Sequence, residues 1–183
     1  MKILGYRISL PTVSVLMLTC LMVALGPTSA LAAKPRPEGC QFQGSWIGYN
    51  ESGASWVSTA DGQSSSAGTY RLESPGYDIT LGGMFSTAIG RSVLRGVWER
   101  IDDYTFGVTV VGLAVDNLGN TLYILKLSGI DTLSMDCESM HIHSTIEFFS
   151  GNQDPFDPAA IPFYTMYSPP HMGYRMRVDP PAS

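Results

Sequence analysis

Two histidines and a glutamate recur along one short segment with the types and spacing that suit a metal ion. His141, His143 and Glu147 have the same parity, so on a β-strand their side chains project to one face. Imidazoles and carboxylates are ligands that zinc, iron and manganese take in proteins. The same alternation also fits a strand whose polar face is wet while Met140 and Ile142 face a core. Both interpretations follow from this segment alone.

The spacing His-x-His-x3-Glu resembles the first metal motif of cupins. This resemblance implies a metal-dependent enzyme carried by His141, His143 and Glu147. The glycines that flank the cupin motif are absent, and His171 lies in a Pro-Pro-His segment without matching neighbours. The chain has no Gly-x-Ser-x-Gly elbow and no phosphate-binding loop with its lysine. We therefore expect a protein without a cofactor and favour a non-catalytic role, with the metal-dependent enzyme as an alternative.

The segments that must position these residues are short and rich in β-branched and aromatic residues with a period of two. This pattern predicts an all-β domain, a single antiparallel β-barrel or closed sandwich of about 8–10 strands. Only Met84–Ile89 suggests a short helix. From residue 53 onward, the predicted strands are Ser55–Ser58, Gly68–Glu73, Tyr77–Leu81, Ser92–Arg100, Tyr104–Val115, Thr121–Leu127, Ile130–Met135 and Met140–Phe149.

The N-terminal segment has the layout of a secretory signal peptide. Lys2 and Arg7 precede the apolar run Val13–Leu25, and Ala30-Leu31-Ala32 provides the small residues of a cleavage site. The run is shorter than the roughly 20 apolar residues of a membrane span. The sequence predicts a signal peptide over residues 1–32, no stable membrane span, and export to the periplasm or the extracellular space.

The rest of the chain divides by composition into a Pro-rich lead-in (33–42), a β-barrel domain (43–149) and a C-terminal extension (150–183) rich in Pro, Met and Tyr. In the extension, Met172, Tyr174 and Met176 alternate with Gly173, Arg175 and Arg177. This predicts an extra strand with an apolar and a cationic face. The extension is therefore expected either to pack on the domain or to contact a protein partner, which would make the protein an envelope or extracellular interaction module.

The charge balance argues against nucleic acid as a partner. The formal net charge is −5, and the chain contains no run of Lys or Arg. Binding to nucleic acid requires a basic footprint that neutralises phosphates. The acidity instead favours solubility.

The cysteines predict one disulfide. Cys20 lies inside the apolar signal segment, which leaves Cys40 and Cys137 as a pair in an exported chain. In an even-numbered closed meander, Cys40 and a turn before the last strand lie at opposite ends, too far apart for a bridge. Either the lead-in runs back along the wall, or the C-terminal strand pairs beside the first strand and changes the count.

Gly44-Ser45-Trp46, at the start of the first strand, resembles the Gly-x-Trp motif of lipocalins, and Asp103-Tyr104 resembles their second signature. The resemblance implies a barrel with a cavity for a small apolar ligand, closed at one end by the tryptophan with an arginine packed on it. Arg175 or Arg177 is the candidate for that arginine. Aromatic residues that recur on several strands are the candidate ligand-binding lining: Trp46, Trp56, Tyr70, Trp98 and Phe106.

Overall fold

A computed structural model describes residues 39–50, 53–62, 64–74 and 78–177. The predicted signal peptide, most of the lead-in and the last residues of the extension lie outside the described residues. Within the described part, every regular element is a strand. Residues 79–87 form a series of turns. The short helix suggested at Met84–Ile89 and the predicted strand Tyr77–Leu81, in its described part, are therefore both wrong.

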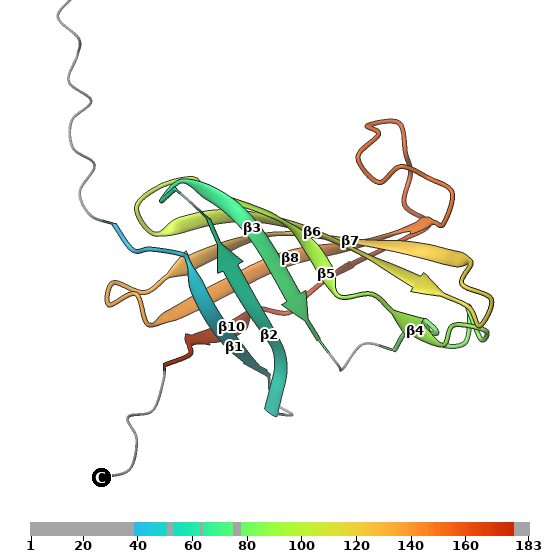
Figure 1. Cartoon of the computed structure of the whole chain (residues 1–183), viewed down its shortest axis with the longest axis horizontal. Coiled ribbons are helices and arrows are strands. Elements are labelled where there is room, and N and C mark those ends of the chain that lie inside the picture. The colour runs from blue at the N-terminus through green and yellow to red at the C-terminus, as the bar shows by residue number, and fades with distance from the viewer. Residues whose placement is uncertain (1–38, 51–52, 63, 75–77, 178–183) are drawn as a thin grey trace, which may run out of the picture. The chain divides into compact units, whose positions relative to one another are not determined.

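Ten strands form one antiparallel sheet (Figure 1). They are β1 (Gly44–Asn50), β2 (Gly53–Asp61), β3 (Ala67–Glu73), β4 (Gly90–Arg91), β5 (Leu94–Arg100), β6 (Thr105–Val115), β7 (Thr121–Leu133), β8 (Ser139–Ser150), β9 (Tyr164–Tyr167) and β10 (His171–Arg175).

The sheet closes on itself through β10. This strand pairs with β1, where Gly173 lies opposite Gly48, and with β8, where Gly173 lies opposite Met140. The closed ring therefore contains eight strands, β1-β2-β3-β5-β6-β7-β8-β10. The two remaining strands lie outside the ring. β4 pairs with the end of β6, and β9 pairs with the C-terminal half of β8. The predicted all-β closed fold is confirmed.

The disulfide joins Cys40 to Cys137, with Cα atoms 5.4 Å apart. Because β10 is the eighth strand of the ring, β8 is the seventh, and its first residues lie at the end of the barrel where β1 begins. The alternative in which a C-terminal strand pairs beside the first strand therefore removes the topological conflict. A bridge of this kind is typical of proteins that fold in an oxidising compartment.

Alternate residues of each strand face the interior of the barrel. On β6 these include Phe106, Val108 and Val110, all buried. The two strands predicted on either side of Gly129 are one strand, β7. A Cβ at Gly129 would lie 2.8 Å from the carbonyl oxygen of His143, so the glycine permits close approach of β8 rather than ending the strand.

In β10 the apolar side chains face outward and the cationic side faces inward, the opposite of what their polarity predicts. Gly173 and Arg175 lie on the inner side, whereas Tyr174 and Met176 are exposed. The reason is local, since only glycine fits against Trp56 at position 173 and the Arg175 guanidinium covers Trp46.

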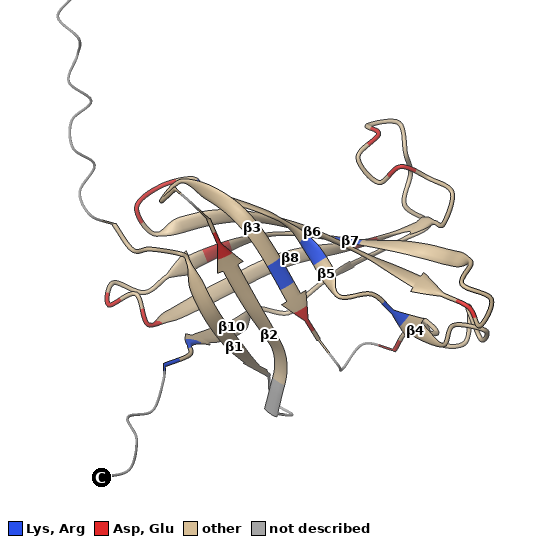
Figure 2. Ribbon diagram, viewed as in Figure 1, with Lys and Arg blue, Asp and Glu red and all other residues tan. Residues whose placement is uncertain are grey.

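Acidic residues gather in the loops at the strand ends (Figure 2). Many of these carboxylates build the turns they occupy by accepting hydrogen bonds from backbone N–H groups two residues on, as Asp102 does from Tyr104 and Asp116 from Leu118. Among the described residues, no helix is long and apolar enough to cross a bilayer.

Candidate functional site

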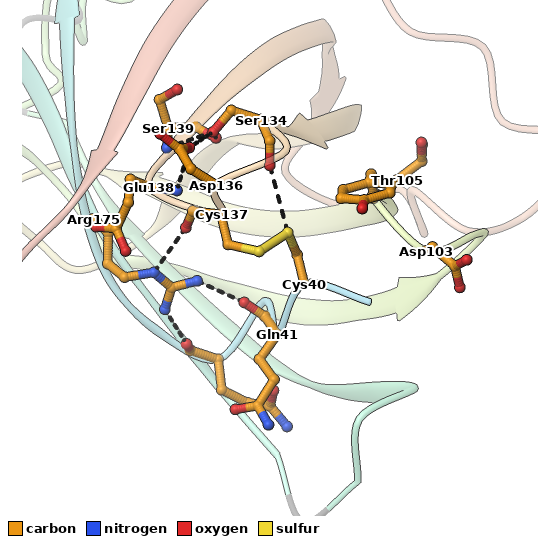
Figure 3. Close-up of a disulfide and its surroundings, with 12 residues drawn as sticks. Cys40, Gln41, Asp103, Thr105, Ser134, Asp136, Cys137, Glu138, Ser139 and Arg175 are labelled. Atoms are coloured by element: carbon orange, nitrogen blue, oxygen red, sulfur yellow. Dashed lines mark hydrogen bonds between the residues drawn. A yellow bond between two sulfur atoms is a disulfide. The ribbon is translucent and has the colours of Figure 1, made fainter. Parts of the chain in front are cut away.

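One end of the barrel is closed by Arg175 and Trp46. The Arg175 guanidinium carbon lies 4.2 Å from the centroid of the Trp46 ring. Its nitrogens donate to the backbone oxygens of Cys137, Gln43 and Gln41, beside the disulfide (Figure 3). The expectation that Arg175 or Arg177 packs on Trp46 is therefore met by Arg175.

Gly44 makes room for this closure. Its φ is +132°, a backbone conformation that favours glycine, and a Cβ there would lie 2.8 Å from Nη1 of Arg175. The Gly-x-Trp spacing thus has a physical basis in this chain, because the glycine lets the arginine reach the tryptophan.

Phe42 fills the interior next to this closed end. Its ring lies 4.6 Å from that of Phe106, 5.4 Å from Trp98 and 5.7 Å from Tyr70, between centroids. The Trp46 indole N–H donates to the Phe42 carbonyl. Four of the five predicted lining residues therefore surround a phenylalanine from the lead-in, and here the interior is filled by the protein itself.

Trp56, the fifth predicted lining residue, lies across a pair of glycines. A Cβ on Gly48 would fall on its indole ring, and one on Gly173 would lie 2.8 Å from its Cη2 atom and 2.9 Å from Cε of Met140. The indole thus runs along the inner wall over β1 and β10 toward β8.

A small cluster of polar side chains lies in this apolar interior. Ser58 and Asp131 are the buried polar residues of the described chain. The Tyr70 hydroxyl donates to Ser58 Oγ at 2.8 Å. Burial and the nearby Asp131 carboxylate raise the pKa of Tyr70 well above its ordinary value. These three side chains come from β2, β3 and β7 and meet inside the ring.

Asp131 has no hydrogen-bond or ion-pair partner among the described residues, and although only 3% of its surface is exposed, its carboxylate oxygens keep some contact with solvent. It lies opposite Phe106 on β6 and Ile142 on β8, both inward-facing. Burial raises the pKa of its carboxyl to about 7. A carboxylate with this environment is a candidate ligand-binding group.

Solvent reaches part of the inner wall near Asp131. Leu127, Ile142 and Ser144 have inward parity on β7 and β8, and His171 lies opposite Ile142 on β10, yet all four are only half-buried. His171 Nε2 is 2.7 Å from Ser168 Oγ, and burial lowers its pKa. Solvent therefore reaches the inner face of the barrel at these four side chains.

The three residues of the predicted metal site lie on the outer face of β8. His141 and His143 are exposed, and Glu147 is 3.4 Å from Nζ of Lys126 in an ion pair. Over the described ranges, no three His, Cys, Asp or Glu side chains lie close enough together to hold a metal ion.

Sequence reasoning missed Phe42 and Asp131. Phe42 stands in a Pro-rich segment without periodicity, and no pattern there indicates that it enters the barrel. Asp131 carries a usable signal, because it shares parity with Tyr123, Leu125 and Leu127 once β7 is taken as one strand. Because the prediction divided β7 into two strands around Gly129, this shared parity was not recognised.

These features define a class of fold, a closed eight-stranded antiparallel barrel with one end sealed by an arginine and a tryptophan. Comparison with models of known protein families and with curated proteins finds no match to this chain.

Proposed function

We propose that the chain is an exported protein that binds a small, largely apolar molecule inside the barrel. The single observation that carries the proposal is that solvent reaches four half-buried side chains on the inner wall, those of Leu127, Ile142, Ser144 and His171. The lipocalin resemblance supports it, because Gly44, Trp46 and Arg175 are arranged as that family's closed end requires. The apolar interior suits a ligand that loses little hydration on entry.

The test begins with native mass spectrometry of the purified protein, followed by titration with N-phenyl-1-naphthylamine, a neutral apolar fluorophore. All three tryptophans of the chain lie inside the barrel, so their emission reports on a probe that enters. We expect saturable quenching of tryptophan and enhanced probe emission.

A pair of variants locates the binding. Leu127→Trp places an indole on the solvent-reached part of the inner wall and should weaken probe binding at least tenfold. Ile130→Trp is the control, because Ile130 is on the same strand, faces outward and is 41% exposed. Equal binding by both variants would reject the barrel interior as the site.

A second candidate function, contact with a protein partner, is favoured by apolar side chains on the C-terminal extension. Ile161 and Tyr167 are 78% and 79% exposed. Deleting the extension is a poor test, because β10 is a strand of the ring. The double variant Ile161→Ser, Tyr167→Ser leaves β10 intact, and unchanged capture of a partner by this variant would reject the candidate.

A further inference from the structure

We propose that the molecule bound in the barrel carries a protonated amine, which pairs with the carboxylate of Asp131. This inference rests on the proposed ligand-binding function and specifies the chemical class of the ligand. A buried carboxylate in a folded protein is ordinarily hydrogen-bonded or paired with a cation. Asp131 has neither among the described residues.

The side chains around Asp131 do not supply its counter-ion. Phe106 and Ile142 are its direct neighbours on β6 and β8. The charge of Asp131 helps to raise the pKa of Tyr70, but the Tyr70 hydroxyl donates to Ser58 and not to Asp131. His171, beyond Ile142 on β10, is neutral at pH 7 because burial lowers its pKa.

The arginines at the closed end are committed to other partners. Arg175 donates to three backbone carbonyls beside the disulfide. Arg100 donates to the backbone oxygens of Cys40, Ser65 and Asp103, and its guanidinium lies 4.8 Å from the centroid of Phe106. None of these described groups supplies a cation to the ionised Asp131, so we assign that role to the ligand.

The surroundings of the carboxylate favour an organic cation over a metal ion. A metal ion needs several oxygen or nitrogen ligands, and no such cluster is found over the described ranges. An alkylammonium group needs one carboxylate, with aromatic faces and hydroxyls around it. The interior offers the rings of Tyr70 and Phe106 and the hydroxyl of Ser58.

The solvent-reached wall lies beside the carboxylate. Ile142 is directly opposite Asp131, and Leu127 and Ser144 follow along the same inner face. An amine with an apolar body therefore has an apolar wall for its hydrocarbon part and Asp131 for its charge. The net charge of −5 also raises the local concentration of cations over anions.

The test uses two matched probe series measured by calorimetry at pH 8, with tryptophan fluorescence as a second readout for the dodecyl series, whose members carry no indole. One is tryptamine, tryptophol and indole-3-acetate; the other is dodecylamine, dodecanol and dodecanoate. In each series only the polar group changes, from cation to neutral to anion. We expect at least one amine to bind ten or more times tighter than its matched alcohol and carboxylate.

Two variants test whether Asp131 is responsible for the preference for amines. Asp131→Asn keeps the shape and removes the charge, and should weaken amine binding at least tenfold while changing alcohol binding less than threefold. Glu99→Gln, an exposed residue on β5, is the matched control and should keep the wild-type preference. Circular dichroism checks that both variants are folded.

If Asp131→Asn does not fold, the wild-type protein still decides the question. Amine affinity should rise at least tenfold from pH 5.5 to pH 8.5 as Asp131 loses its proton, and alcohol affinity should stay flat. Equal affinity for amine and alcohol, or an amine preference that survives Asp131→Asn, overturns the inference and leaves the binding function intact. Failure of every probe, including N-phenyl-1-naphthylamine, overturns the proposed function as well.

Discussion

The Arg175 guanidinium lies 4.2 Å above the Trp46 ring while its nitrogens donate to three backbone carbonyls. This contact joins β10, the last strand of the ring, to β1, the first. The carbonyls come from both segments that the disulfide connects, Gln41 and Gln43 on one side and Cys137 on the other. One side chain thus ties together the lead-in, the β7–β8 turn and the closing strand.

Replacing Arg175 should lower the free energy of unfolding more than replacing Arg177. We expect Arg175→Met to lower the free energy of unfolding by about 2–4 kcal/mol, because partly buried carbonyls lose charged donors. Arg177→Met is the control, since Arg177 is exposed and its partner among the described residues is Glu138; it should cost under about 1 kcal/mol. Urea unfolding measures both, and equal losses would contradict the assigned role of Arg175.

The disulfide should contribute strongly to stability, because it closes a long loop. Cys40 and Cys137 are 97 residues apart, and the chain-entropy model gives about 4–5 kcal/mol for a loop of this length. The double variant Cys40→Ser, Cys137→Ser should unfold at correspondingly lower urea concentration. Its tryptophan emission should also shift to the red, because Phe42 is no longer held between Trp98 and Phe106. An unchanged midpoint would argue that the lead-in is held by packing alone.

Much of the fold follows from alternation in the sequence. Period-two segments predict a closed all-β domain, and the cysteine pair is found as predicted. Closure itself depends on pairing between β10 and strands far away in sequence, which single-segment periodicity does not encode. Two sequence observations pointed to this strand. The alternation over residues 172–177 predicted the strand itself, and the conflict between Cys40 and Cys137 in a meander indicated that it pairs beside the first strand.

The interior was harder to predict than the wall. The aromatic residues Trp46, Tyr70 and Trp98 are inward because large apolar side chains are buried, as expected. All three pack around Phe42, whose place is set by the disulfide and not by a strand pattern. Asp131 contradicts the rule that charged residues face water, and such exceptions are expected at functional or strained sites.

The glycine pair beneath Trp56 can be tested by adding a single methyl group. Gly48→Ala places a Cβ on the Trp56 indole and should cost about 1–3 kcal/mol through overpacking. Gly107→Ala is the matched control, because the nearest atom to its Cβ is 3.6 Å away, an ordinary contact. It should be neutral or stabilise by up to about 1 kcal/mol. Thermal unfolding compares them, and similar midpoints would contradict the close approach of Trp56 to β1.

Asp131 should make the unliganded protein less stable as the pH rises. Burial raises the pKa of this carboxyl to about 7 in the folded state, whereas an unfolded Asp titrates near 3.9. Between these values the folded state holds a proton that the unfolded state has released. Stability therefore falls from about pH 4 to about pH 7 and then levels off, by at most about 4 kcal/mol.

Asp131→Asn removes this dependence, so the variant should be more stable than wild type at pH 8 and similar to it at pH 4.5. Urea unfolding at pH 4.5, 6 and 8 measures the difference, with Glu99→Gln as a control that should follow the wild-type curve. Surface carboxyls such as Asp78 and Asp116 have lowered pKa values, so their contribution is lost only as the pH falls below the range measured here. Parallel wild-type and Asp131→Asn curves across pH 4.5–8 would mean that the carboxylate is not desolvated as the structure places it.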